Sequence, residues 1–124
     1  MEGRSPVIAV VEDDASMLRS IQRLLVIEGF NVEAYPSAEA FLDKHSTSQA
    51  DCMVLDIQLS KTSGIELRQQ LTTMGSDVPI IFITAIEDKG VEEVAIQVGC
   101  VAYLRKPFHP EALVAAIAVA LDSR

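Results

Sequence analysis

Four short apolar runs in this chain lead into polar residues that could do phosphoryl chemistry. The runs and their followers are Val7–Val11 before Glu12, Asp13 and Asp14; Cys52–Leu55 before Asp56; Ile80–Ile83 before Thr84; and Val101–Leu104, shortly before Lys106. Carboxyl ends of parallel strands lie at one edge of a sheet. There, three or four carboxylates, a hydroxyl and an ammonium would form a site for a divalent cation and a phosphoryl group.

The elements that must position these residues alternate between strand and helix patterns. The strand patterns are the four runs above and Asn31–Tyr35, whose alternation predicts a half-exposed edge strand. The helix patterns are Ala15–Glu28; a segment capped by Ser37; Ser63–Met74; a stripe of Val91, Val94, Ala95 and Val98; and a segment from Pro110 with Leu113, Ile117 and Leu121. Such alternation predicts an α/β fold, (βα)5, with a doubly wound five-stranded parallel sheet.

Composition limits what the chain can be. The 124 residues fit one domain, and 49% hydrophobic residues favour a folded core. A net charge of −8 argues against nucleic-acid binding by this segment. Cys52 and Cys100 lie in or beside apolar runs and are expected to be reduced. With no signal-peptide pattern and no run long enough to span a membrane, we expect a cytoplasmic location.

Five motifs in order resemble those of response regulator receiver domains, the CheY-like family. They are Val10–Asp14, Val54–Asp56, Ser63–Gly64, Ile83–Ala85 and Tyr103–Phe108, so the resemblance covers nearly the whole chain, 1–124. The stretches Pro36–Leu42 and Ser63–Leu67 are most similar to receivers of the FixJ type. The resemblance implies a flavodoxin-like strand order of 2-1-3-4-5.

The resemblance also implies a role for each site residue. Asp56 would accept the phosphoryl group, and Glu12, Asp13, Asp56 and the backbone carbonyl of Gln58 would bind Mg²⁺ or Mn²⁺. Lys106 would pair with a phosphoryl oxygen, followed by a cis bond to Pro107. The remaining roles are Thr84 as hydroxyl donor, Ala85 as the small neighbour that leaves room, Tyr103 as the coupled aromatic, and Gln58 and Ile86 as residues that tune hydrolysis.

Each assignment has a purely structural alternative. Asp14 and its acidic neighbours could simply favour a helix N-terminus. Lys106 could be a solvated lysine, and Thr84 a β-branched residue that closes a strand. Tyr103 could be a half-buried core tyrosine with its hydroxyl in water. In addition, Leu59 and Ser60 stand where the family often has a proline-containing pair, which suggests a more mobile loop.

These residues favour a phosphorylation-dependent switch. A histidine kinase or histidine phosphotransfer protein would phosphorylate Asp56, and a surface from Val91 to Leu121 would then bind a second receiver or an output target. The alternative is a receiver-like interaction module that does not respond to phosphate, against which the full set of site residues argues. An aspartate-based phosphatase is disfavoured because Gln58 stands where a second aspartate is needed. We expect catalysis only of the protein's own phosphorylation and dephosphorylation.

Overall fold

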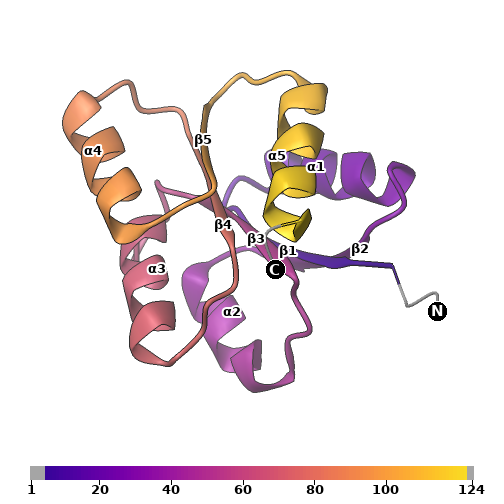
Figure 1. The fold of residues 1–124 in the computed structure, drawn as a ribbon, viewed down its shortest axis with the longest axis horizontal. Coiled ribbons are helices and arrows are strands. Elements are labelled where there is room, and N and C mark those ends of the chain that lie inside the picture. Colours follow the sequence, from indigo (N-terminus) through magenta and orange to yellow (C-terminus); the bar gives the residue numbers. More distant parts are fainter. Residues whose placement is uncertain (1–4, 123–124) are drawn as a thin grey trace.

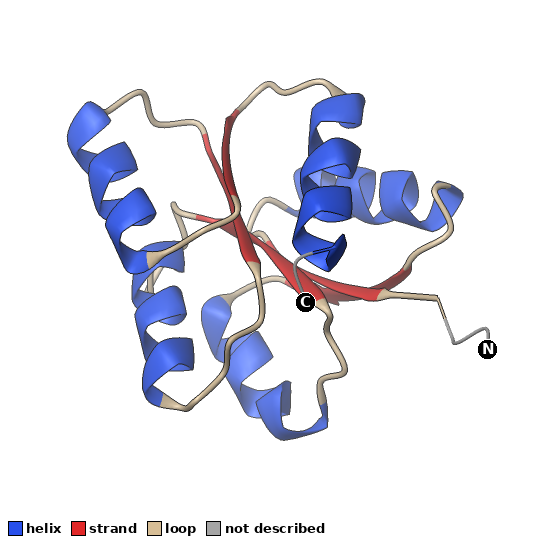
Figure 2. Cartoon of the chain, viewed as in Figure 1, coloured by secondary structure: helices blue, strands red, loops and turns tan. Residues whose placement is uncertain are grey.

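A computed structural model describes residues 5–122, and they form one five-stranded parallel sheet in the order β2-β1-β3-β4-β5 (Figures 1 and 2). The strands are β1 (Val7–Val11), β2 (Asn31–Tyr35), β3 (Cys52–Asp56), β4 (Ile80–Thr84) and β5 (Ala102–Arg105). The helices are α1 (Ala15–Ile27), α2 (Ala38–Lys44), α3 (Gly64–Thr73), α4 (Lys89–Val98) and α5 (Pro110–Asp122), with a 3-10 turn at His45–Thr47. The predicted fold class and strand order are confirmed.

The sheet separates two apolar cores. On one face, α1 and α5 pack through Ile21, Leu25, Leu113 and Ile117, whereas α2, α3 and α4 cover the other face (Figure 1). Because both faces of the sheet are covered, every residue of β1, β3 and β4 is buried. These three strands are therefore a rigid base for the residues at their carboxyl ends.

Strand register aligns the site residues at one edge. Val11 pairs with Leu55, Asp56 with Ile83, and Thr84 with Arg105. The ends of β1, β3, β4 and β5 thus come together within a few residues of one another in the sheet. The predicted edge strand β2 lies at one margin, where none of its residues is fully buried.

Local sequence signals fix where the helices begin. The Asp14 side chain caps α1 by accepting from the Met17 N–H at 3.0 Å. This agrees with the alternative that Asp14 serves a helix N-terminus. Ser37 caps α2 in the same way. At α3, Ser63 and Glu66 form a reciprocal capping box. The start of α3 is therefore firmly set.

The apolar stripe predicted on the fourth helix is only partly buried. Within that stripe only Ala95 is fully buried; Val91 and Val98 are half-buried, and Val94 is 42% exposed. The reason is that α4 packs on α3 and on β5, which is itself an edge strand with no fully buried residue. An edge position gives a helix too little surface to bury the whole stripe, so Val94 remains exposed.

Smaller differences concern the last strand and the last helix. β5 begins at Ala102 and ends at Arg105, one residue later than predicted, and Leu121 of α5 is half-buried. Neither Cys52 nor Cys100 is part of a disulfide, as expected. None of the helices in the described part of the chain is long and apolar enough to cross a membrane.

Candidate functional site

Three carboxylates meet where β1 and β3 end. Ligand oxygens of Glu12, Asp13 and Asp56 all lie within 4.8 Å of one another. Glu12 and Asp56 are buried, whereas Asp13 is exposed. Hard carboxylate oxygens at this spacing are the ligands that Mg²⁺ and Mn²⁺ prefer. The cluster has an excess of negative charge that favours a cation.

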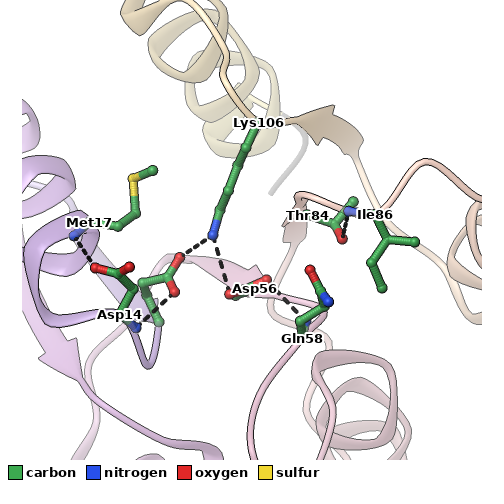
Figure 3. Close-up of polar contacts among 8 residues, drawn as sticks. Asp14, Met17, Asp56, Gln58, Thr84, Ile86 and Lys106 are labelled. Carbon is green, nitrogen blue, oxygen red and sulfur yellow. Dashed lines mark hydrogen bonds and ion pairs between the residues drawn. The ribbon is translucent and has the colours of Figure 1, made fainter.

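Lys106 reaches this cluster from the end of β5 (Figure 3). Its Nζ lies 2.7 Å from Glu12 Oε1 and 3.3 Å from Asp56 Oδ2. Its backbone N–H donates to the Thr84 carbonyl at 2.8 Å, and the bond to Pro107 is cis. Lys106 is therefore held at the site by its backbone and by its ammonium group, and it is not a solvated lysine.

The Asp56 carboxylate is held by two donors. Oδ1 accepts the Gln58 N–H at 3.0 Å and Oδ2 faces Lys106 (Figure 3).

Gly64 packs directly on the same strand end: a Cβ built there would collide with the Asp56 carbonyl oxygen and would lie 3.0 Å from the Ile57 Cα. The Gly64 N–H also donates to the Ile57 carbonyl at 3.0 Å. The close approach explains the glycine of the Ser63–Gly64 motif.

Burial and charge shift the pKa of two groups here. Burial raises the pKa of Glu12 above its ordinary value, and the nearby Asp56 carboxyl adds to the rise, while hydrogen bonds from Lys106 and the Asp14 N–H oppose it. Burial alone would lower the pKa of Lys106, but its hydrogen bond to Glu12 and the charges of Asp56 and Glu12 outweigh that effect and raise it. Lys106 is thus cationic at neutral pH.

The side chains of Thr84, Ala85 and Ile86 make no hydrogen bond to the carboxylates within the described part of the chain. Thr84 is fully buried, and its Oγ1 accepts the Ile86 N–H at 3.0 Å. In the described part of the chain, no side-chain hydrogen bond joins Thr84 to Asp56. Ala85 is exposed and Ile86 is half-buried. In Figure 3, Asp14 lies on one side of Asp56, and Thr84 and Ile86 lie on the other.

Tyr103 lies on β5 and packs against the core that α2, α3 and α4 cover. Its hydroxyl is buried and has no hydrogen-bond partner among the described residues. Burial is the main cause of a raised pKa for this hydroxyl, and the nearby charge of Glu92 contributes. Tyr103 is therefore a half-buried core tyrosine, as its structural alternative predicts, but the part of that alternative that places its hydroxyl in water is wrong.

Sequence reasoning missed two residues near the site. Thr62 Oγ1 donates to Glu39 Oε2 at 2.7 Å, which joins the segment after β3 to α2. Neither residue belongs to a strand end or to an apolar stripe, and their separation of 23 positions leaves no local pattern. Only the folded arrangement of α2 beside this segment brings them together.

The comparisons with known proteins agree with this geometry. The family model described as "Response regulator receiver domain" matches residues 8–118. The chain belongs to this family. Its receiver fold places Glu12, Asp13, Asp56, Thr84 and Lys106 at the same sheet edge.

Relatives of this receiver domain are longer proteins. The response regulator protein TodT of Pseudomonas putida is 36% identical over 121 residues, which is 98% of this chain and 53% of TodT. The transcriptional regulatory protein FixJ of Bradyrhizobium diazoefficiens is 35% identical over 114 residues, 92% of this chain and 56% of FixJ. The receiver domain thus spans about half the length of these relatives.

Solved structures show the same similarity. The structure titled FixJ-N has a TM-score of 0.90 and 28% identity, and the match covers all of this chain and 98% of that one. The response regulator StyR has a TM-score of 0.88 and 39% identity over 96% of this chain and 60% of its own. The domain is therefore a response regulator receiver of two-component systems, with FixJ among its similar proteins.

Proposed function

We propose that Asp56 of this receiver accepts a phosphoryl group from a histidine kinase or a histidine phosphotransfer protein. The observation that carries the proposal is the contact of Lys106 Nζ with both Glu12 and Asp56 inside a cluster of three carboxylates. A lysine at this point can neutralise a phosphoryl oxygen next to Asp56. The carboxylates beyond it can hold the cation that such a transfer needs.

The donor set fits a magnesium ion. Receiver domains generally use Mg²⁺, and Glu12, Asp13 and Asp56 supply hard oxygen ligands within 4.8 Å of one another. The backbone carbonyl of Gln58 would complete the protein ligands, and Mn²⁺ would suit the same oxygens. Bound there, the cation would offset the negative charge of the incoming phosphoryl group.

The transfer itself is a nucleophilic substitution at phosphorus. A carboxylate oxygen of Asp56 forms a bond to phosphorus while the bond to the donor's imidazole nitrogen breaks, so the imidazole leaves and an acyl phosphate forms. The Gln58 N–H and Lys106 hold the carboxylate of Asp56 in place. The protein would also catalyse hydrolysis of this acyl phosphate, with Gln58 and Ile86 controlling the water, but would not act on other substrates.

Phosphorylation would then bias the surface from Val91 to Leu121. Thr84 would exchange its contact with the Ile86 N–H for one to the phosphoryl group, Ala85 leaves room for that group, and Tyr103 already has a buried hydroxyl. Exposed apolar side chains support a binding role for this surface: Val94, Ile96 and Val119 are 42%, 58% and 59% exposed.

The partner on that surface would be a second receiver or an output domain. We further propose that the domain occupies residues 1–124 and binds no nucleic acid itself, in keeping with its net charge of −8. The cytoplasmic location stays a prediction. No observation favours the phosphate-independent module over the switch.

Intact-mass measurement tests the proposal. The wild type, Asp56→Asn and the control Asp43→Asn, which changes an exposed aspartate on α2, are incubated with acetyl phosphate and Mg²⁺. We expect one phosphoryl group on the wild type and on the control, none on Asp56→Asn, and none on any protein after chelation. An unmodified wild type, under conditions that rule out rapid hydrolysis, would favour the phosphate-independent module.

A further inference from the structure

The segment between Asp56 and α3 has strong restraints at its two ends and few in its middle. At the start, the Gln58 N–H is bound to Asp56 Oδ1, and the half-buried Leu59 packs against the core. At the finish, Gly64 is fixed against the end of β3 and Ser63 caps α3. The intervening residues Ser60, Lys61 and Thr62 make no backbone–backbone hydrogen bond within the described part of the chain.

The Glu39 carboxylate restrains this middle part, since it accepts hydrogen bonds from the hydroxyl and from the backbone of Thr62. Thr62 Oγ1 donates to Glu39 Oε2 at 2.7 Å. A hydrogen bond from a hydroxyl to an ionised carboxylate at this length is among the stronger kinds. The Thr62 hydroxyl lowers the pKa of Glu39, and the charge of Lys61 adds to that effect, so Glu39 is ionised at neutral pH.

Glu39 is a firm anchor because its helix is well fixed. It lies in the first turn of α2, where the helix dipole favours a negative charge. Ser37 caps that helix, and Ala38 and Phe41 bury it in the core on either side of Glu39. A contact to Glu39 therefore ties the segment to the body of the domain.

We propose that the Glu39–Thr62 hydrogen bond positions the segment that carries the Gln58 carbonyl and thereby sets the affinity of the phosphorylation site for Mg²⁺. Both are positioning residues, since neither touches Asp56 in the described contacts. The inference rests on the proposed function. Its physical basis is that a preorganised ligand loses less conformational entropy when it binds a cation.

Four variants and a control distinguish this positioning role from a general contribution to the stability of the fold. Thr62→Val keeps the β-branched shape and removes the hydroxyl, whereas Thr62→Ser keeps the hydroxyl. Glu39→Ala removes the acceptor, and the double variant Glu39→Ala/Thr62→Val completes a double-mutant cycle. The control is Thr73→Val, which removes a hydroxyl bound to the Gln69 carbonyl on the exposed side of α3.

The first measurement uses the metal-free protein. We expect ¹⁵N relaxation to show faster motion of the amides of residues 59–63 in Thr62→Val and Glu39→Ala, but not in Thr62→Ser or Thr73→Val. The second measurement is the Mg²⁺ concentration for half-maximal phosphoryl uptake from acetyl phosphate. It should rise about two- to fivefold in Thr62→Val, as expected for losing one hydrogen bond. In the double variant it should be no higher than in Glu39→Ala, which alone removes the acceptor of the Thr62 hydroxyl.

The outcomes separate the two proposals. If Thr62→Val matches Thr73→Val in both measurements, if Thr62→Ser behaves like Thr62→Val, or if the two single effects simply add, the positioning role is refuted. If the wild type takes up no phosphoryl group, the proposed function fails instead. The relaxation measurement on metal-free protein still decides whether the hydrogen bond restrains the segment.

Discussion

Replacing Gly64 with alanine tests whether close packing behind Asp56 shapes the site. A Cβ at this position would collide with the Asp56 carbonyl oxygen and would lie 3.0 Å from both the Asp56 carbonyl carbon and the Ile57 Cα. All three are backbone atoms at the end of the buried strand β3, so no flexible side chain can move away. The strand end or the start of α3 must shift instead.

The expected cost follows from this geometry. Overpacking of this kind destabilises a protein by about 1–3 kcal/mol. Gly64 is the first residue of α3, where the higher helix propensity of alanine recovers up to about 1 kcal/mol. Taking about 2 kcal/mol, the middle of the overpacking range, and subtracting a gain of up to about 1 kcal/mol leaves a net loss of about 1–2 kcal/mol. For 124 residues, the usual entropy of unfolding converts each kcal/mol into about 4 °C, so Tm should fall by about 4–8 °C.

A second glycine provides the matched control. Gly90 lies in the first turn of α4, and a Cβ there would meet only Asp88 Oδ1, at 3.2 Å, which is the end of a side chain. Gly90→Ala should leave Tm unchanged or raise it by up to about 4 °C. The assay is thermal unfolding by circular dichroism, with phosphoryl uptake from acetyl phosphate measured on the folded proteins. A Tm within about 1 °C of wild type and normal uptake in Gly64→Ala would refute the packing argument.

Three further predictions concern the charges around Asp56. Burial raises the pKa of Glu12 above 4.5, so the folded metal-free protein binds a proton more readily than the unfolded chain. Relative to Glu12→Gln, wild type in EDTA should therefore lose stability as pH rises from 4.5 through the raised pKa, and a Tm difference independent of pH would contradict this. Mg²⁺ at about 100 times its Kd should stabilise the wild type by about 2.7 kcal/mol, and exposed Asp13→Asn should lose most of that gain in a melting assay without losing metal-free stability. Substitution of Gln58 or Ile86 should change the rate of phosphoryl loss measured by intact mass; unchanged rates would mean that they do not control the hydrolytic water.

Sequence patterns predicted the fold well because burial is uneven along this chain. Continuous apolar runs such as Val7–Val11 match strands that are covered on both faces, and the alternating run Asn31–Tyr35 matches the edge strand. The cap at Asp14 and the glycine stop at Gly29, with φ of 95°, are local signals that need no tertiary information. These positions could be predicted from sequence.

Other features depend on tertiary position, which a single sequence does not encode locally. Val94 has the spacing of a buried residue, but α4 lies at the edge of the sheet and leaves it exposed. The Glu39–Thr62 hydrogen bond joins two polar residues that belong to no periodic apolar pattern in the sequence. Likewise, the strand-end rule placed Thr84 near Asp56 but could not predict that its hydroxyl accepts the Ile86 N–H.

The charge balance of the site connects its stability to its proposed role. Glu12, Asp13 and Asp56 form one cluster of carboxylates. The ammonium of Lys106 pairs with Glu12 and Asp56, and both of these are buried. Burying carboxylates that outnumber their partner costs stability, which the raised pKa of Glu12 reflects. A divalent cation would relieve this excess negative charge, and a phosphoryl group would restore part of it beside Lys106. The excess negative charge that lowers stability in the metal-free state is therefore the same feature that would make the site bind a cation and respond to phosphate.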